Sequence, residues 1–288
     1  MAIVNLTSGG AQAEIATFGA EPRVWRVGGR ELLWPGDEAI WGQISPVLFP
    51  VVGWTRDGER VAGKWYPLSL HGFAMTEEFA VQAAQEDFAR LTLADNERTR
   101  AQYPFAFRFA AEYRLTSNAF DMTLEVENPG DEPLPYACGL HPGFRWPFGG
   151  GKREGAIVRF AEAEAPEAPI IAPGGLISSR RKPLPMNGRD LALSDELFKG
   201  DAICMLGLKS RSLSFVEENG AAITMDFPGF DHVGLWMRPG APFLCLEAWT
   251  GYSDPAGFAG DLFEKPSMRV LAPGEGARHG ATYRFTPA

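Results

Sequence analysis

The amino-acid sequence predicts an all-β fold, a β-sandwich or a β-barrel, with few short helices. The first observation behind this prediction is that 33 glycines and 23 prolines interrupt the 288 residues too often for long helices. The second is that the segments between these breaks are short and alternate apolar with polar residues. Many short segments of this period are typical of β-sandwiches and β-barrels.

The expected strands follow from this alternation. Aromatic residues occupy every second position from Tyr103 to Phe109, and the next segment ends at the turn signal Pro129–Gly130. We expect strands in residues 101–115, 120–128, 213–217, 222–227, 233–237, 242–249 and 279–286. Residues 194–198 are expected to form at most a turn, and residues 254–258 are a candidate start of a short helix.

The domain prediction is a single domain over residues 1–288. The glycine-rich stretch 148–155 resembles a linker in composition, but strand-like residues flank it on both sides, which favours a surface loop within one domain. Residues 162–169 are acidic and proline-rich, and we expect them to form an exposed excursion.

Composition and charge narrow the possible partners and the compartment. The formal charge of −9 disfavours nucleic acid or an anionic membrane as the main partner. The three cysteines (Cys138, Cys204 and Cys245) are far apart and show neither a CxxC pair nor zinc-ligand spacing, which indicates free thiols in a reducing compartment. With no signal-peptide pattern and no stretch of about 18 apolar residues, we expect a cytoplasmic protein without a membrane span.

Three titratable residues carry the functional hypothesis. Glu247 is the only charge in the apolar run 242–249, so its carboxylate either faces solvent from an edge strand or is desolvated at a site. His71 precedes Gly72, while Pro142 biases His141 toward extended geometry. Each histidine is also compatible with a structural role, but two imidazoles and one carboxylate are suited to acid–base chemistry near neutral pH.

The motifs around these residues resemble those of the aldose 1-epimerase (galactose mutarotase-like) family, closest to its shorter bacterial branch. Residues 45–53 are similar to the family's proline–phenylalanine–proline segment before a glycine, and residues 71–74 and 141–144 to its two histidine motifs. Residues 245–255 are similar to the strand that bears its catalytic glutamate. The order and spacing hold from about residue 18 to residue 285.

The resemblance implies an antiparallel β-sandwich whose concave face binds a pyranose. It implies that Glu247 takes the proton of the anomeric hydroxyl, that His141 donates a proton to the ring oxygen, and that His71 orients the sugar. It also implies a substrate-binding aspartate, which corresponds to Asp201 or Asp195. The reaction exchanges protons only, so no cofactor and no metal are expected.

The chain departs from the family pattern at two positions. Trp54 stands where the family usually has an arginine after the glycine, so either Arg56 replaces that cation or Trp54 stacks on the sugar. Met75 stands where a second arginine is common. The loss of two cationic donors argues against a phosphorylated sugar.

The sequence therefore predicts a cofactor-free epimerase that interconverts the α and β anomers of a free aldohexose or a related sugar. The alternative is a non-catalytic carbohydrate-binding protein on the same scaffold. A glycoside-processing enzyme would need a second carboxylate beside Glu247, and the spacing supports neither Asp201 nor Asp226 in that role. The expected ligand is a monosaccharide, and the expected state is a monomer or a homodimer.

Overall fold

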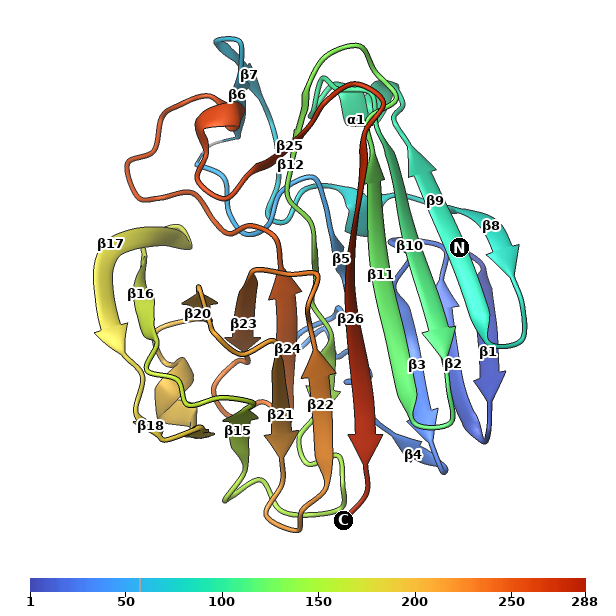
Figure 1. Ribbon diagram of the computed structural model, residues 1–288, viewed down its shortest axis with the longest axis vertical. Helices are drawn as coiled ribbons and strands as arrows, with labels where there is room; N and C mark the ends of the chain where they lie inside the picture. The colour runs from blue at the N-terminus through green and yellow to red at the C-terminus, as the bar shows by residue number, and fades with distance from the viewer. Residues whose placement is uncertain (57) are drawn as a thin grey trace.

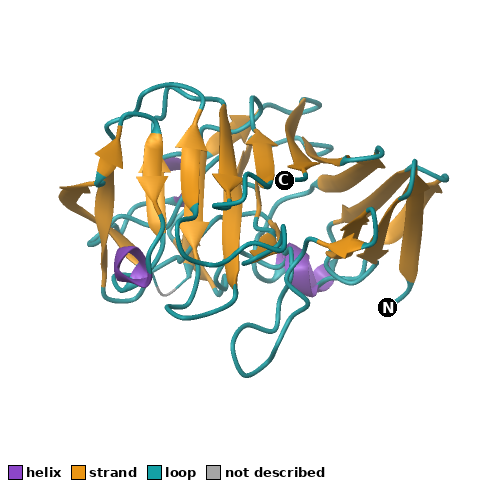
Figure 2. Cartoon of the chain, turned by 90° about the horizontal axis from the view of Figure 1, so that it is seen from below, coloured by secondary structure: helices purple, strands orange, loops and turns teal. Residues whose placement is uncertain are grey.

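The computed structural model describes residues 1–56 and 58–288, and strands dominate it (Figures 1 and 2). Strands hold 47% of the residues and helices 5%, and neighbouring strands in its main sheets run antiparallel. The predicted all-β class is therefore confirmed. The described residues contain no helix long and apolar enough to cross a membrane.

The largest sheet has ten strands and forms the broad layer at the front of Figure 1. Along β11, buried and half-buried residues alternate because one face covers the core and the other faces solvent. The strand order is β18 (Met186–Asn187), β19 (Asp190–Ala192), β15 (Ile157–Phe160), β21 (Ser212–Val216), β22 (Ala222–Asp226), β26 (Gly276–Thr286), β11 (Ala119–Glu127), β10 (Arg108–Leu115), β9 (Phe88–Ala94) and β8 (Ala80–Ala84).

Two further sheets pack behind this layer. One has the order β20 (Ile203–Leu206), β23 (His232–Trp236), β24 (Phe243–Trp249), β13 (Gly139–Leu140) and β5 (Val47–Leu48), and β14 (Gly143–Arg145) also pairs with β24. The other has the order β1 (Ile3–Ser8), β2 (Ala11–Ala16), β3 (Pro22–Val27) and β4 (Arg30–Glu31).

Aromatic side chains from all three sheets meet in the core. The ring of Trp25 on β3 lies 6.0 Å from that of Phe120 on β11 and 6.3 Å from that of Phe144 on β14. Tyr283 on β26 lies 5.4 Å from Phe144 between ring centroids, and its hydroxyl donates to the backbone oxygen of Leu246. Tilted and edge-on contacts between the inner faces of sheets are the usual packing of a β-sandwich, as predicted.

Most of the predicted strand segments are present, but the first is partly wrong. Residues 97–100 form helix α1 (Glu97–Arg100), residues 101–107 are irregular, and only β10 is a strand. The side chain of Asn96 caps α1 by accepting from the backbone N–H groups of Arg98 and Thr99, which starts a helix there. The alternating aromatics bury themselves from this loop instead, for example Phe107 at 5.0 Å from Phe49.

Two hairpins, one further strand pair and three 3₁₀ helices complete the fold. The hairpins are β6 (Glu59–Val61) with β7 (Lys64–Tyr66), and β16 (Glu167–Ala172) with β17 (Leu176–Pro183). The further pair joins two strands that are far apart in the chain, β12 (Leu134–Tyr136) and β25 (Arg269–Leu271). The 3₁₀ helices are η1 (Ala74–Thr76), η2 (Asp195–Phe198) and η3 (Leu262–Glu264). The turn expected at 194–198 matches η2, and residues 148–155 form the expected loop.

Two expectations for the loops are wrong. Residues 254–258 form no helix; Pro255 instead makes a parallel bridge with Ile177. Residues 162–169 are not simply an exposed excursion, because Glu167 begins β16 and Glu164 is buried. Glu164 tolerates burial because its carboxylate accepts a 2.7 Å hydrogen bond from the backbone N–H of Ser210.

Candidate functional site

The candidate site lies where β24 pairs with β13 in the same sheet. Every residue of β24 is buried, and Glu247 is opposite Gly234 of β23 in the register. His141 follows β13 directly, and Leu140 is paired with Ala248 on β24, so the chain delivers His141 next to Glu247. His141 Nε2 lies 3.1 Å from Glu247 Oε2.

Burial pushes both partners toward their neutral forms. It raises the pKa of Glu247 well above its usual value, and it lowers the pKa of His141 well below its usual value, with a further lowering from nearby His71. The second polar atoms, His141 Nδ1 and Glu247 Oε1, have no hydrogen-bond partner among the residues described. Polar groups left unpaired in the interior are costly and therefore point to a functional site.

His71 approaches the pair from a different loop. Its backbone is left-handed with φ 61°, and the backbone N–H of Gly53 donates to its Nδ1 at 3.0 Å. Because Nδ1 accepts, the neutral ring carries its proton on Nε2 and can donate it. Burial lowers the pKa of His71 to about 4, so the ring is neutral near pH 7. The ring centroids of His71 and His141 are 5.5 Å apart.

All three residues line one cavity of about 400 Å³. This volume lies within the range of small-molecule pockets. Its wall is rich in large aromatic side chains, which come from several separate segments of the chain: Trp41, Trp54, Trp236, Trp249 and Tyr252. Trp41 lies beside His141 in a tilted arrangement, with 5.2 Å between ring centroids.

Polar residues also line this cavity. Asp201 is one of them, whereas Asp195 is exposed on η2 and forms an ion pair of 2.6 Å with Arg153. Arg238 and Gln43 line the cavity as well. Of the two aspartates left open by the sequence, the structure brings Asp201 together with the histidines and Glu247.

Trp54 and Arg56 also differ in whether they line the cavity. Trp54 lines the cavity, and its indole packs against Gly175 in the turn of the β16–β17 hairpin. Arg56 is not among the lining residues; its backbone N–H donates to Asp254 Oδ2 at 2.8 Å, and its guanidinium lies 3.5 Å from the backbone oxygen of Phe258.

Several lining residues were missed by reasoning from the sequence. Arg238 is two residues after Trp236, and residues two apart on a strand lie on the same face. Extending the expected strand 233–237 by one residue would therefore have indicated that Arg238 shares the face of Trp236. Gln43 lies in an irregular segment and offered none; its amide lies 3.0 Å from the sulfur of Met75. The two positions that depart from the family pattern therefore both contact or line the cavity wall.

One set of side chains also has the composition of a metal site. Ligand atoms of His141, Cys245 and Glu247 all lie within 4.8 Å of one another, and all three residues are buried.

Asp226, the other carboxylate considered for glycoside chemistry, lies on the ten-stranded sheet and forms an ion pair of 3.2 Å with Arg284.

A histidine–glutamate pair lies in an aromatic cavity of a β-sandwich, and comparison with known proteins shows the family to which the chain belongs. The aldose 1-epimerase family model matches residues 2–283, so the chain belongs to that family. The chain is 30% identical over 257 residues to the chromosomal LacX protein of Lactococcus lactis subsp. lactis, covering 85% of this chain and 86% of that one. Identity to the plasmid LacX protein is 29% over 260 residues, with the same coverage.

Solved structures agree with the predicted galactose mutarotase-like fold. A galactose mutarotase related enzyme from Lactobacillus acidophilus superposes with a TM-score of 0.91 at 29% identity, covering 99% of this chain and 97% of that chain. A galactose mutarotase-like protein from Lactobacillus casei ATCC 334 gives 0.92 at 25% identity, with coverages of 99% and 100%. The predicted fold class is thereby confirmed.

Proposed function

We propose that this protein is a cofactor-free aldose 1-epimerase that interconverts the α and β anomers of a free aldohexose or a related sugar. The observation that carries the proposal is the 3.1 Å contact between His141 and Glu247 inside an aromatic cavity that His71 and Asp201 also line. Membership of the aldose 1-epimerase family supports it.

The chemistry follows from the form of the substrate. In a cyclic aldose the anomeric hydroxyl oxygen and the ring oxygen are both bonded to C1, so a base and an acid that touch each other can face both atoms. Glu247 takes the proton of the hydroxyl as His141 protonates the ring oxygen, and the C1–ring oxygen bond breaks. Rotation about C1–C2 and closure from the other face, with the proton roles reversed, produce the other anomer.

The pair of His141 and Glu247 already holds the proton that the reaction needs. A neutral glutamic acid beside a neutral imidazole holds the same number of protons as a carboxylate beside an imidazolium, and one transfer along the 3.1 Å contact interconverts them. Burial favours the neutral arrangement. Sugar hydroxyl groups that enter the cavity supply hydrogen bonds to the ionised arrangement, which is the reactive one.

The other lining residues bind the sugar. His71 donates its Nε2–H to a sugar oxygen, and Asp201 accepts from a sugar hydroxyl, which together orient the ring. Trp54 provides an apolar face in place of the family arginine. These contacts favour a neutral monosaccharide.

Polarimetry of freshly dissolved α-glucose and α-galactose, with and without protein, tests the proposal directly. We expect the optical rotation to reach its equilibrium value faster with protein for at least one aldose in a broad panel. If every aldose equilibrates at the uncatalysed rate, the protein is not an aldose 1-epimerase.

A second candidate function is non-catalytic carbohydrate binding, which the replacement of the family arginine by Trp54 favours. Isothermal titration calorimetry separates the two functions. Tight binding of a sugar whose mutarotation is not accelerated would establish the second candidate and exclude the first for that sugar.

We further propose that the 288 residues act as a single domain in the cytoplasm, as a monomer or homodimer. The three cysteines are free and buried, which suits a reducing compartment. Light scattering after size-exclusion chromatography measures the assembly state, and a mass above that of two chains would contradict this proposal.

A further inference from the structure

The indole of Trp249 is hydrogen-bonded to the carboxylate proposed as the base. Trp249 and Glu247 are two positions apart on β24, so both side chains leave the same face of the strand. Trp249 Nε1 donates to Glu247 Oε2 at 3.1 Å, and this bond is buried. The same oxygen lies 3.1 Å from His141 Nε2, so two nitrogen atoms hold one carboxylate oxygen.

Two glycines on the neighbouring strands create the space in which this indole lies. Gly139 on β13 is paired with Trp249, and a Cβ there would lie 2.8 Å from Cδ1 of the indole. Gly234 on β23 is paired with Glu247, and a Cβ there would overlap the six-membered ring of the indole. The indole therefore lies across three strands, at a depth that only glycine permits on both sides.

This arrangement has a consequence for Glu247. One oxygen of this carboxylate contacts Trp249 of the same strand and His141 of the segment after β13, and rotating the carboxylate would break both contacts. Its orientation is therefore set before a substrate arrives. An N–H donor also stabilises the ionised carboxylate, which opposes the effect of burial. The base is thereby kept both oriented and ionisable.

We propose that Trp249, seated over Gly139 and Gly234, is a positioning residue that holds the carboxylate of Glu247 for proton transfer. This inference rests on the proposed epimerase function. The rival role is a stacking platform for the sugar, because Trp249 also lines the cavity. The two roles differ in what they change: positioning acts on kcat and on the titration of Glu247, whereas stacking acts on KM.

The first test is Trp249→Phe, which keeps an aromatic face and removes the N–H. We expect kcat for mutarotation to fall about tenfold or more, the loss typical of one hydrogen bond to a charged group, with KM changed less than threefold. We expect the acidic limb of the pH–rate profile to move upward by about one pH unit. A rise in KM with unchanged kcat and pH profile would overturn the proposal in favour of stacking.

The second test does not need activity. The pKa of Glu247 is measured by NMR of ¹³C-labelled glutamate carboxyl groups, with the resonance assigned from its loss in Glu247→Gln. Trp249→Phe should raise this pKa, whereas Trp236→Phe should leave it unchanged. Trp236 is the matched control because it lines the same cavity and makes no hydrogen bond to Glu247 among the described residues.

Gly234→Ala provides a variant that keeps the indole but displaces it. It should raise the pKa of Glu247 as Trp249→Phe does. The control is Gly276→Ala on β26, where a Cβ meets only ordinary contacts at 3.4 Å, and it should leave this pKa unchanged.

Thermal unfolding identifies which variants are folded, and one folded variant, either Trp249→Phe or Gly234→Ala, is enough for the test. An unchanged titration in a folded variant would overturn the proposal. If the wild-type protein accelerates no aldose, the proposed function fails, and the NMR titration still decides the role of Trp249.

Discussion

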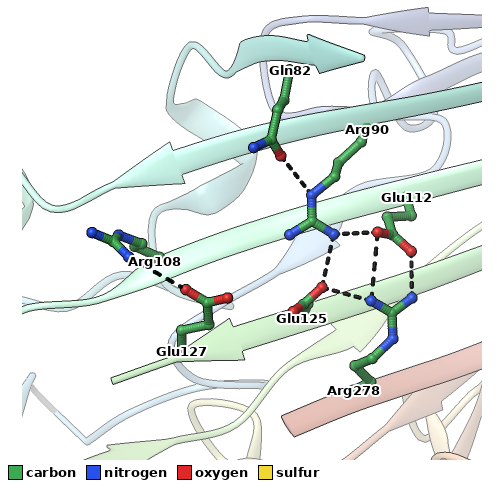
Figure 3. A network of polar contacts seen from close by, with 7 residues as sticks. All are labelled: Gln82, Arg90, Arg108, Glu112, Glu125, Glu127 and Arg278. Atoms are coloured by element: carbon green, nitrogen blue, oxygen red, sulfur yellow. Dashed lines mark hydrogen bonds and ion pairs between the residues drawn. The ribbon is translucent and has the colours of Figure 1, made fainter. Parts of the chain in front are cut away.

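Two clusters of ionisable side chains lie on opposite layers of this sandwich, and they behave in opposite ways. One is the pair His141–Glu247 under the cavity. The other is a network on the solvent face of the ten-stranded sheet, shown in Figure 3, in which Arg90 and Arg278 bind both Glu112 and Glu125. Both clusters are assembled by the register of antiparallel strands, since Arg90 opposes Glu112 and Glu125 opposes Arg278.

The difference shows in the two glutamates. Partial burial alone would raise the pKa of Glu112, but hydrogen bonds from Arg278 and Arg90 outweigh it and lower that pKa. Burial raises the pKa of Glu247, and no arginine among the described residues forms an ion pair with it. The outer network balances two positive and two negative charges, which stabilises the fold, whereas the proposed function requires the inner pair to exchange a proton.

The largest effect should come from removing the inner carboxylate. We expect Glu247→Gln to lower kcat for mutarotation by about 10²–10⁴-fold, since the amide cannot accept the proton, while sugar binding measured by calorimetry is retained. Glu112→Gln makes the same change in the outer network and should keep full activity. A fully active Glu247→Gln variant would show that Glu247 is not the base of the reaction.

A third cluster tests how strongly burial changes the contribution of an ion pair to the stability of the fold. Lys265 Nζ is fully buried and lies 2.7 Å from Asp254 Oδ1 and 3.5 Å from Glu59 Oε1. Lys265→Met should lower the free energy of unfolding by about 3–5 kcal/mol at pH 8, because it strands two buried carboxylates.

Urea unfolding measures this loss, with Lys199→Met as the control, since its partner Glu196 is exposed. A loss below about 1 kcal/mol for Lys265→Met, similar to the control, would show that this buried triad behaves like a surface pair.

The pH dependence of stability should reveal that His71 stays neutral in the folded protein, unlike a solvent-exposed histidine. His71 has a pKa of about 4 in the folded protein, against 6.5 when unperturbed. Between these values the unfolded chain binds a proton that the folded protein does not, so stability falls as pH drops from 6.5 to 4, by about 2.5 kcal/mol.

His71→Gln should lack this contribution, so its stability relative to the wild type should rise on acidification. The comparison between the two proteins is needed because Glu59, whose pKa burial raises to about 7, changes stability in the opposite direction between pH 4.5 and 7. Parallel stability curves for the wild type and His71→Gln would contradict the prediction.

The smallest effect should come from the outer network. Arg278 is half exposed, so Arg278→Gln should cost about 0.5–1 kcal/mol at low salt and almost nothing in about 1 M salt. Urea unfolding at both salt concentrations measures it. A larger loss that persists in high salt would mean that the outer network contributes to stability as a buried one does.

The sequence alone determined the fold class and the chemistry-bearing residues. Strands such as β11 and β22 follow from period-2 alternation because one face of each lies against the core and the other is less buried. Glu247 was conspicuous for the opposite reason, as one charge in a strand that is buried on both faces. Both are local signals, which neighbouring residues are sufficient to produce.

Other features depended on contacts between distant segments, and the sequence did not predict them. The aromatic alternation before Phe109 was mistaken for a strand because the capping by Asn96 and the burial of Phe107 against Phe49 override it.

Residues 162–169 were expected to be an exposed excursion, yet Glu164 is buried against the backbone of Ser210 and Glu167 begins β16. Nothing in the sequence indicated that Ile171 and Gly175 of the β16–β17 hairpin line the cavity.

The site itself shows the same division. That His141, His71 and Glu247 belong together was predictable from their motifs, but which atoms meet was decided by the tertiary structure. Strand register places Gly234 opposite Glu247 and so admits the indole of Trp249, and a backbone N–H on a separate loop selects the proton position of His71. Residue identity determines what chemistry is possible, whereas register and loop packing determine distances, and proton transfer depends on distance.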